Sequence, residues 1–313
     1  MIPVAVIGAG MAGVTAARRL AQTGFAPVLF DKSNGISGRM ATRRLADLQF
    51  DHGAQYFTAR GPRFRAVLDR WCAAGLAAEW FDDRFVGLPG MNAVLRAEAA
   101  GLPLVPHCFV SGLRKDDHGW TVVVRDGDVT APHNGRYGAV LLALPAPQAA
   151  PLAAAAGLRV DALHQAVYAP CWTLLLAYAE PIGLPDRMRF DEGPIVWIAR
   201  NGSKPGRPAD TETIVVQASP AWSRRHLELS PDRVASLLME AFLRATGCGH
   251  DPLFVQAHRW RYARVEQAAG VPCLWDPDAR VGCCGDWCLG PRIECAFDSG
   301  EAAAEAVIAT FAA

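Results

Sequence analysis

The sequence lacks the features that mark several classes of protein. It has no uninterrupted run of about 18 apolar residues, the length that a membrane-spanning helix needs, because three prolines break the longest candidate, residues 139–158. Its first residues lack the basic segment and the small-residue cleavage site of a secretory signal. Acidic and basic residues balance at 31 each, so no overall charge attracts nucleic acid or anionic membranes. We therefore expect a cytoplasmic protein that binds neither nucleic acid nor membrane.

Lysine is scarce in this chain. Only Lys32, Lys115 and Lys204 occur among the 31 basic residues, and the others are arginine. Together with the many alanines, this skew indicates GC-rich coding rather than a functional requirement.

The nine cysteines do not form a metal-binding or disulfide pattern. Their number is odd and most are scattered, and the cluster Cys283-Cys284-Gly-Asp-Trp-Cys288 lacks a second ligand pair at zinc-like spacing. Reduced, partly buried thiols are the ordinary state of cysteine in a cytoplasmic protein. We expect no bound metal.

The first 31 residues have the pattern of a strand, a helix and a second strand. Residues 4–7 form a continuous apolar run, which is typical of a strand buried on both faces. Residues 12–23 are mostly helix formers, and the apolar run 27–30 ends on Asp31. This order predicts a parallel β-α-β unit.

Three glycines occupy the turn between the first strand and the helix. In a G-x-G-x-x-G turn, Gly8 permits the tight bend, Gly10 lets the backbone approach a pyrophosphate, and Gly13 lets the helix pack on the strand. Asp31 follows Gly13 by 18 residues, where a carboxylate accepts hydrogen bonds from ribose hydroxyls. The unit predicts dinucleotide binding rather than a merely tight turn. Lys32 leaves a phosphorylated nicotinamide cofactor open.

Two later features favour FAD over a nicotinamide cofactor. Gly35-Ile-Ser-Gly38-Arg39-Met40 is followed by Asp51-His-Gly-Ala-Gln-Tyr-Phe57, and Gly285-Asp-Trp287 precedes a helix of small residues. With Val6-Ile-Gly-Ala-Gly-Met-Ala-Gly13 and Leu88-Pro-Gly-Met-Asn92, these segments resemble the renalase family, within the wider group of FAD-dependent amine-oxidase-like flavoproteins. The matching segments span nearly the whole chain. The resemblance implies that FAD is the cofactor.

The resemblance and the motifs together assign residues to the cofactor. Arg39 suits a phosphate, unless it is an ordinary surface arginine. Asp286 suits the ribityl chain, unless it only caps a helix, and the backbone N–H groups of Ile293 and Glu294 suit the pyrimidine end of the flavin. The resemblance puts Phe109 and Val110 near the adenine. The full expected set is Gly8, Gly10, Met11, Ala12, Gly13, Asp31, Lys32, Arg39, Met40, Ala54, Gln55, Tyr56, Phe109, Val110, Gly285, Asp286, Ile293 and Glu294.

Acid–base and nucleophilic sets are unconvincing, so we assign no catalytic side chain. Ser219 and His226 lack a recognisable nucleophile elbow or triad order, and a flavin carries hydride chemistry by itself. Trp260, Arg261 and Tyr262 concentrate aromatic and cationic groups and are our candidates for substrate binding. A packing seam between domains explains the same stretch equally well.

Length and pattern predict an α/β protein of two joined domains. The expected architecture is a Rossmann-type FAD-binding domain, with a discontinuous mixed α+β substrate (cap) domain, as in amine-oxidase-like proteins. The FAD-binding domain should comprise 1–59, 86–150 and 278–313, and the cap 60–85 and 151–277. Further elements are expected as strands at 104–111, 120–125 and 137–144 and as helices at 62–75, 231–246 and 294–311.

The resemblance implies an FAD-dependent oxidase. It would take hydride from a reduced small molecule to the flavin and pass the electrons to O2, giving H2O2. The implied substrate is a 2- or 6-dihydro isomer of NAD(P). Two alternatives stay open: an amine oxidase or desaturase on the same scaffold, with Trp260 and Tyr262 in an aromatic cage, and a flavin-binding sensor without turnover.

Overall fold

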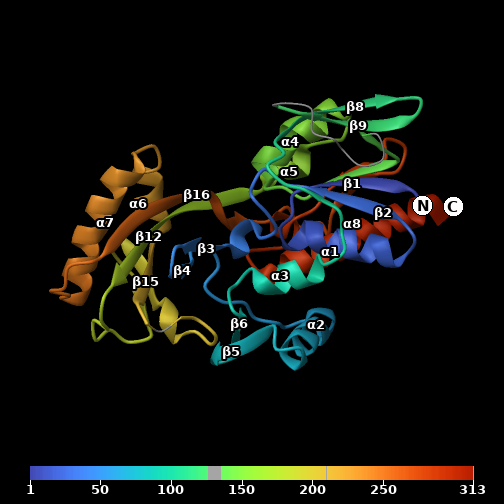
Figure 1. The fold of residues 1–313 in the computed structure, drawn as a ribbon. Helices are drawn as coiled ribbons and strands as arrows, with labels where there is room; N and C mark the ends of the chain where they lie inside the picture. The colour runs from blue at the N-terminus through green and yellow to red at the C-terminus, as the bar shows by residue number, and fades with distance from the viewer. Residues whose placement is uncertain (126–134, 209, 313) are drawn as a thin grey trace.

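The computed structural model describes residues 1–125, 135–208 and 210–312. They form an elongated molecule with a mainly parallel sheet near both chain ends and an antiparallel sheet at the opposite end (Figure 1). Hairpins and short helices lie between and beside the two sheets. The predicted α/β class is confirmed.

The mainly parallel sheet has six strands. In spatial order they are β17 (Leu274–Asp276), β18 (Val281–Cys283), β11 (Ala139–Leu142), β1 (Pro3–Ile7), β2 (Ala26–Phe30) and β7 (Leu104–Val105). Neighbours are parallel except β17 and β18. Along β1, Val4 and Val6 enter one hydrophobic core, and Ala5 and Ile7 enter the other. Both faces are covered, which explains why this strand is continuously apolar.

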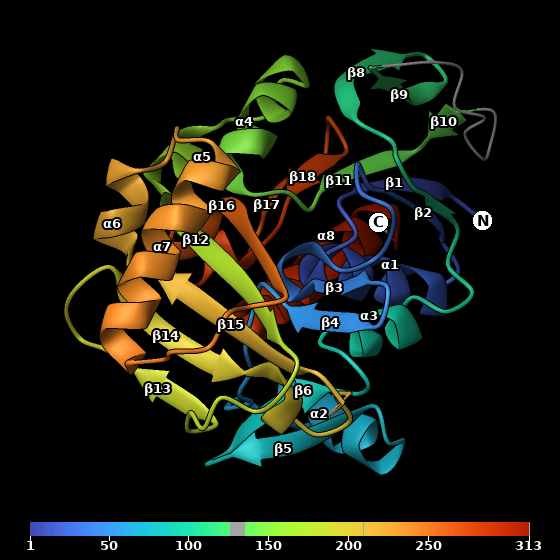
Figure 2. The same cartoon turned by 60° about the vertical axis from the view of Figure 1, so that its left-hand side comes forward.

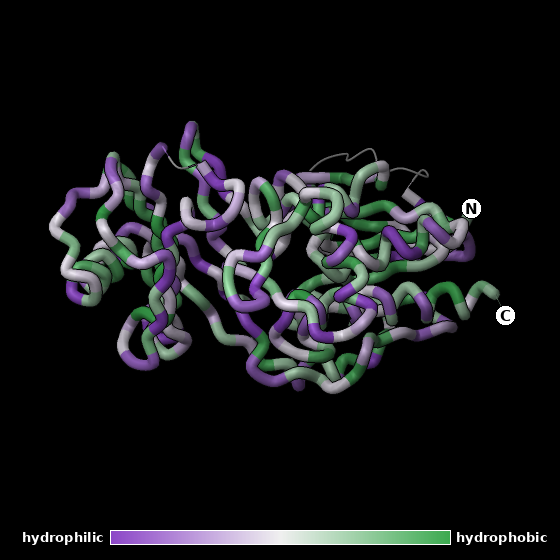
Figure 3. The backbone as a smooth tube through the Cα atoms, turned by 90° about the horizontal axis from the view of Figure 1, so that it is seen from below, coloured by the Kyte–Doolittle hydropathy of each residue, from purple (hydrophilic) through white to green (hydrophobic). Residues whose placement is uncertain are grey.

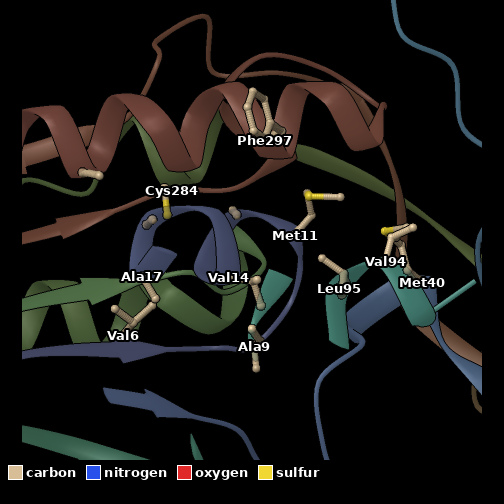
Figure 4. Packing of buried hydrophobic residues seen from close by; sticks show 14 of the residues in the cluster. Val6, Ala9, Met11, Val14, Ala17, Met40, Val94, Leu95, Cys284 and Phe297 are labelled. Atoms are coloured by element: carbon tan, nitrogen blue, oxygen red, sulfur yellow. The ribbon is translucent and has the colours of Figure 1, made fainter. Parts of the chain in front are cut away.

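Helices α1 (Met11–Gln22) and α8 (Ile293–Ala312) cover one face of this sheet. They pack closely, because a Cβ added to Gly300 of α8 would lie 2.4 Å from the Ala12 carbonyl oxygen of α1. Figure 4 shows Val14 and Ala17 of α1 between β1 and α8. Along α8, hydrophobic and hydrophilic segments alternate in Figure 3, as expected for a helix buried on one side.

The other face of the six-stranded sheet is covered by helices and a small sheet. These elements are α4 (Ala146–Ala155), α5 (Asp161–Gln165), β8 (Val110–Asp116), β9 (Gly119–Val124) and β10 (Arg136–Tyr137).

The antiparallel sheet has five strands. In spatial order they are β13 (Arg187–Arg189), β14 (Ile195–Arg200), β15 (Glu212–Ala218), β12 (Val167–Tyr178) and β16 (Phe254–Gln267). Helices α6 (Pro220–Arg225) and α7 (Pro231–Thr246) pack on its outer face (Figure 2). On its inner face, Leu175 and Val215 pack against Phe50 of a neighbouring hairpin. That inner face therefore looks toward the N-terminal half of the chain.

The remaining elements link the two sheets. They are the hairpins β3 (Thr42–Leu45) with β4 (Leu48–Asp51) and β5 (Ala77–Phe81) with β6 (Arg84–Gly87), helices α2 (Pro62–Ala73) and α3 (Ala93–Glu98), and 3-10 turns at Gly38–Met40, Asn201–Ser203 and Asp286–Cys288.

Most predicted elements are present, but two of the expected strands are divided between sheets. The single strand expected at 137–144 is wrong, because β10 ends at Tyr137 in the three-stranded sheet and β11 begins at Ala139 in the six-stranded one. The helix expected at 231–246 is α7, and its N-cap Ser230 accepts a hydrogen bond from the Arg233 N–H. The single strand expected at 104–111 is wrong, because β7 and β8 belong to different sheets. Pro106 and then His107, which adopts φ 53°, turn the chain between them.

The domain division stays a prediction, and the sheet pairings bear on two of its boundaries. Strand β17 ends at 276, inside the stretch expected for the cap, but it pairs with β18 in the six-stranded sheet. Hairpin β5–β6 crosses the boundary expected at 85 and 86. Among the described residues, no helix is both long and apolar enough to cross a membrane.

Candidate functional site

The glycine turn leaves no room for larger side chains. A Cβ on Gly13 would lie 1.9 Å from the Gly8 carbonyl oxygen, and one on Gly8 would lie 2.4 Å from the Ala143 carbonyl oxygen. Gly8 also has φ 108°, which favours glycine. Gly10 stands at the N-cap of α1, and Met11 and Ala12 are buried in its first turn. The backbone N–H groups that begin α1 suit a phosphate, as the sequence predicted.

Asp31 is fixed beside this turn. Its Oδ2 accepts a hydrogen bond from the Ala9 N–H at 2.8 Å, and its Oδ1 accepts two from Ser33. Lys32 is exposed. The carboxylate therefore lies at the end of β2, where the β-α-β pattern put it.

Phe109 and Val110 follow a segment that runs beside Asp31, since the Cys108 N–H donates to the Asp31 carbonyl oxygen. Phe109 is 41% exposed, and the Arg125 guanidinium lies 3.9 Å from its ring centroid. Val110 points into a hydrophobic core. Of this pair, only Phe109 has an exposed side chain, and its place near the adenine stays a prediction.

The Arg39 loop lies against the glycine turn. A Cβ on Gly38 would be 3.1 Å from the Cα of Gly10, so the two backbones approach as only glycines allow. Met40 is buried. The Arg39 carbonyl oxygen accepts from the Ala54 N–H at 2.9 Å. The loop therefore joins two of the predicted cofactor segments.

Arg39 also reaches the C-terminal segment. Its two terminal nitrogens donate to the Asp286 carboxylate at 2.7 and 2.6 Å. Four predicted segments, 8–13, 38–40, 53–56 and 285–286, thus come together at the carboxyl end of the parallel strands, where open α/β sheets bind ligands. The arrangement fits FAD, because a cradle of glycines, a guanidinium and two carboxylates match a pyrophosphate and hydroxyl-bearing chains. Arg39 and Asp286 would hold those parts of the cofactor.

The start of α8 closes this side of the site. The Gly285 N–H donates to Ser299 Oγ at 3.0 Å, and α8 begins at Ile293. Buried Glu294 accepts from the Arg60 and Gly61 N–H groups. The Glu294 side chain thus binds the segment before α2. The roles predicted for the N–H groups of residues 293 and 294 stay predictions.

A buried charged cluster supports the segment that follows β4. Asp51 Oδ2 accepts from Arg207 Nη2 and Nε at 2.6 and 3.0 Å, and from Lys204 Nζ at 3.4 Å. Asp51 Oδ1 accepts from Thr42 Oγ1 and the Met91 N–H. The side chains of Asp51, Lys204 and Arg207 are 0% exposed. These two cations hold the pKa of Asp51 below its ordinary value, although burial alone would raise it.

Lys204 connects this cluster to the predicted cofactor segment. Its Nζ donates to Gln55 Oε1 at 3.1 Å, while Gln55 Nε2 donates to the Asp51 and Gly53 carbonyl oxygens at 2.7 and 3.1 Å. Tyr56 lies against Phe81 and Trp197, with ring centroids 5.8 and 5.9 Å away. Gln55 therefore faces the buried cluster, and Tyr56 faces an aromatic group.

Two histidines and Trp260 form a compact group on the inner face of the five-stranded sheet. The rings of His52 and His258 are 4.8 Å apart, and Trp260 lies 5.2 and 4.6 Å from them. Burial, then His258 and Arg43, lower the pKa of His52 to about 3. Burial and Arg43 lower the pKa of His258 to about 4. Both imidazoles are neutral at neutral pH.

The three predicted substrate residues lie on both faces of β16. Trp260 Nε1 donates to the His52 carbonyl oxygen at 2.8 Å. Arg261 forms two hydrogen bonds with exposed Glu228. The Tyr262 ring lies 5.6 Å from Tyr168, and its carbonyl oxygen lies 3.5 Å from Arg39 Nη1. Because side chains alternate along a strand, Arg261 faces away from the other two.

The cysteine cluster is buried. Burial raises the pKa of Cys288 to about 12 and also raises those of Cys283 and Cys284. Across residues 1–125, 135–208 and 210–312, no group of three or more His, Cys, Asp or Glu is arranged to hold a metal ion. The thiols are therefore protonated parts of the core.

The sequence did not reveal Lys204 and Arg207. The pattern of residues 201–212 predicts only a polar loop, and a loop pattern does not show that Lys204 lies beside Asp51, 153 residues earlier in the chain. One signal was available: a lysine kept in a chain that otherwise uses arginine. We attributed the scarcity of lysine to codon usage, so this signal was not used.

Comparison with known proteins agrees with this fold. The family model described as "NAD(P)-binding Rossmann-like domain" matches residues 6–71, and that described as "flavin containing amine oxidoreductase" matches residues 72–308. The structure of a "putative protoporphyrinogen oxidase" from Exiguobacterium sp. 255-15 is 11% identical, with TM-score 0.78, covering 100% of this chain and 99% of that one. Cyclohexylamine oxidase from Brevibacterium oxydans IH-35A is 13% identical, with TM-score 0.68 and full coverage of both chains. A putrescine oxidase variant is 13% identical, with TM-score 0.71, covering 98% and 99%. At such identities, the structural likeness shows a shared fold.

Proposed function

The chain belongs to the flavin containing amine oxidoreductase family, and from this premise we propose that it oxidises a reduced, phosphate-bearing dinucleotide. As a member of that family it is an FAD-dependent oxidoreductase. The proposed substrate is a 2- or 6-dihydro isomer of NAD(P), which gives hydride to the flavin. O2 would then accept the two electrons and two protons, one from the transferred hydride and one from solvent, and leave as H2O2. The finer resemblance to renalases motivates this substrate.

The observation that carries the proposal is the surplus of positive charge around residues 51–56. Lys204 and Arg207 pair there with one carboxylate, that of Asp51, and the charge of Arg43 acts on the neighbouring His52. Arg43 lowers the pKa of both nearby histidines and hydrogen-bonds to Gln256, an uncharged partner. A positive field attracts phosphates and repels protonated amines.

The neutral histidines support the same chemistry. A general acid or base works best when its pKa lies near the operating pH, and His52 and His258 titrate at about 3 and 4. Hydride transfer to a flavin needs little from such groups, because the cofactor carries the difficult step. The role left to the protein is to bind, orient and exclude water.

Anaerobic stopped-flow spectroscopy tests the substrate. We expect the flavin absorbance near 450 nm to bleach after mixing with 2- or 6-dihydro-NAD. Admitting air should restore this absorbance and form H2O2. Absence of bleaching by both isomers would overturn the substrate proposal. Arg43→Gln should raise KM about three- to tenfold, the value of one ordinary hydrogen bond. Arg44→Gln, one position along β3 and exposed, is the matched control and should leave KM unchanged.

An amine oxidase remains the second candidate, because two of the structural relatives above oxidise amines by name. Putrescine and cyclohexylamine therefore belong in the same substrate panel. Bleaching by an amine but not by a dihydronicotinamide would favour this candidate. A protein that binds FAD but is bleached by neither class would instead be a sensor.

A further inference from the structure

The cluster of Asp51, Lys204 and Arg207 carries more positive than negative charge. All three side chains are 0% exposed. Within the described ranges, Asp51 is the one carboxylate that pairs with either cation. With both cations protonated, the buried set has a net charge of +1. Burying an unpaired charge is costly, so this surplus needs a physical explanation.

Lys204 is the less compensated of the two cations. Arg207 makes two short bonds to Asp51 Oδ2, at 2.6 and 3.0 Å, and donates to the Gly87 and Pro205 carbonyl oxygens. Lys204 Nζ is 3.4 Å from the same oxygen and lies closer to Gln55 Oε1, at 3.1 Å. Its ammonium also lies 5.2 Å from the ring of Trp80. Its shortest contact is therefore with a neutral amide of the predicted cofactor segment.

That contact determines how the Gln55 amide is oriented. An ammonium only donates hydrogen bonds, so Lys204 requires the oxygen of Gln55 on its side. Gln55 Nε2 must then face the Asp51 and Gly53 carbonyl oxygens, as it does. Removing the ammonium would leave the orientation of this amide, and of the 53–56 backbone, less determined.

We propose that Lys204 is a positioning residue for the bound FAD, and that its buried charge makes the cofactor easier to reduce. The inference rests on the proposed contact between residues 53–56 and FAD. Reduction takes two electrons from the substrate and protons from solvent or substrate, and the added electron density is stabilised by a nearby cation held in a medium of low dielectric. The surplus charge then has a partner in the reduced form of the protein.

The groups that face Lys204 make its charge responsive to this change. Burial lowers the pKa of Lys204 to about 8, Asp51 raises it and Arg207 lowers it, while Gln55 and Trp80 are uncharged. Negative charge gained nearby would raise that pKa, so reduction should be coupled to the uptake of one proton by Lys204 above pH 8. The potential of wild-type holoenzyme should then fall more steeply with pH above 8 than below it.

The test is the midpoint potential of bound FAD, measured by anaerobic titration with dithionite. We expect Lys204→Met to make reduction at least about tenfold less favourable, or about 30 mV for a two-electron couple. Lys204→Arg should restore most of this and abolish the steeper slope above pH 8. Lys115→Met is the matched control, because Lys115 is an exposed lysine of β8. The midpoint potential of FAD in Lys115→Met should equal that in the wild type.

Thr42→Val separates charge from packing. It removes one hydrogen bond from an uncharged donor to the Asp51 carboxylate and changes no formal charge, so it should lower stability and leave the potential unchanged. An unchanged potential in Lys204→Met with full FAD content would overturn the proposal. If that variant loses FAD or does not fold, the pH dependence of the midpoint potential decides instead. A uniform slope of potential against pH between pH 6 and 10 in the wild type, equal to the slope in Lys204→Arg, would overturn the proposal. Dithionite replaces the natural substrate, so failure of the substrate proposal leaves this result interpretable.

Discussion

The Arg39–Asp286 pair and the Asp51–Lys204–Arg207 cluster both tie together segments far apart in the sequence, but they differ in balance and in access to water. The first is one cation with one anion, with side chains 29% and 10% exposed. The second is two cations with one anion, all 0% exposed. An accessible pair can exchange partners with a ligand. A closed cluster acts only through its charge and through what it holds in place.

This difference assigns different roles to two sites built from the same residue types. Arg39 can turn its fork of N–H groups from a carboxylate to a phosphate, since both accept two parallel hydrogen bonds. Lys204 and Arg207 are closed to solvent and cannot exchange Asp51 for a ligand. We therefore expect changes at the first site to alter FAD affinity, and changes at the second to alter stability and potential.

The largest expected effect is at Asp51. Asp51→Asn leaves two buried cations without their carboxylate, which should lower the free energy of unfolding by about 3–5 kcal/mol. Asp286→Asn, the matched change at the more accessible pair, should cost about 1 kcal/mol. Urea unfolding at several FAD concentrations, corrected for the Kd of each variant, measures both. Equal losses in the two variants would contradict the comparison.

The next largest effect concerns FAD affinity at the first site. Arg39→Met removes a guanidinium that we place against the cofactor phosphates, and should raise the Kd for FAD about 10- to 100-fold. Arg261→Met removes an arginine that pairs with Glu228 on the other side of β16, and should leave that Kd unchanged. Quenching of FAD fluorescence on binding gives both values. A similar Kd in the two variants would remove Arg39 from the cofactor site.

The first site was more predictable from sequence than the second, for physical reasons. The glycine turn and Asp31 lie within one β-α-β unit, whose geometry follows from local pattern, and helix 231–246 carries its own cap at Ser230. Predicting Asp286 as part of the site needed the family resemblance, because Asp286 lies 247 residues after Arg39 in the sequence. Lys204 had neither a local pattern nor a motif. Its position depends on how the 201–207 loop packs on β4, which is a property of tertiary structure.

A smaller effect should appear on acidification beside the buried cluster. The pKa of His258 is about 4 in the folded protein and 6.5 when exposed, so the unfolded chain binds a proton that the folded one excludes. Its contribution to stability is present above pH 6.5 and is lost as pH falls toward 4, by about 2 kcal/mol at pH 5. His258→Asn should reduce the slope of the stability profile between pH 7 and 5 by about half, because His52, with a pKa of about 3, contributes a similar loss. His250→Asn, at an exposed histidine, should not change it. The same slope in all three proteins would show that His258 does not cause the acid loss.

The smallest expected effect concerns Trp260, which lies between the two charged sites. Trp260→Phe loses the hydrogen bond to the His52 carbonyl oxygen, and should cost about 1 kcal/mol of stability. Trp275→Phe loses a comparable bond, to Thr310 Oγ1 in the six-stranded sheet region, and is the matched control. If Trp260 also lines the substrate pocket, as one of the two sequence-based interpretations has it, its variant alone should raise KM for dihydro-NAD about fivefold, the equivalent of one such contact. Equal stability losses with an unchanged KM would show that Trp260 belongs to a packing seam. The aromatic group around Tyr56 would then be the better candidate for the substrate pocket.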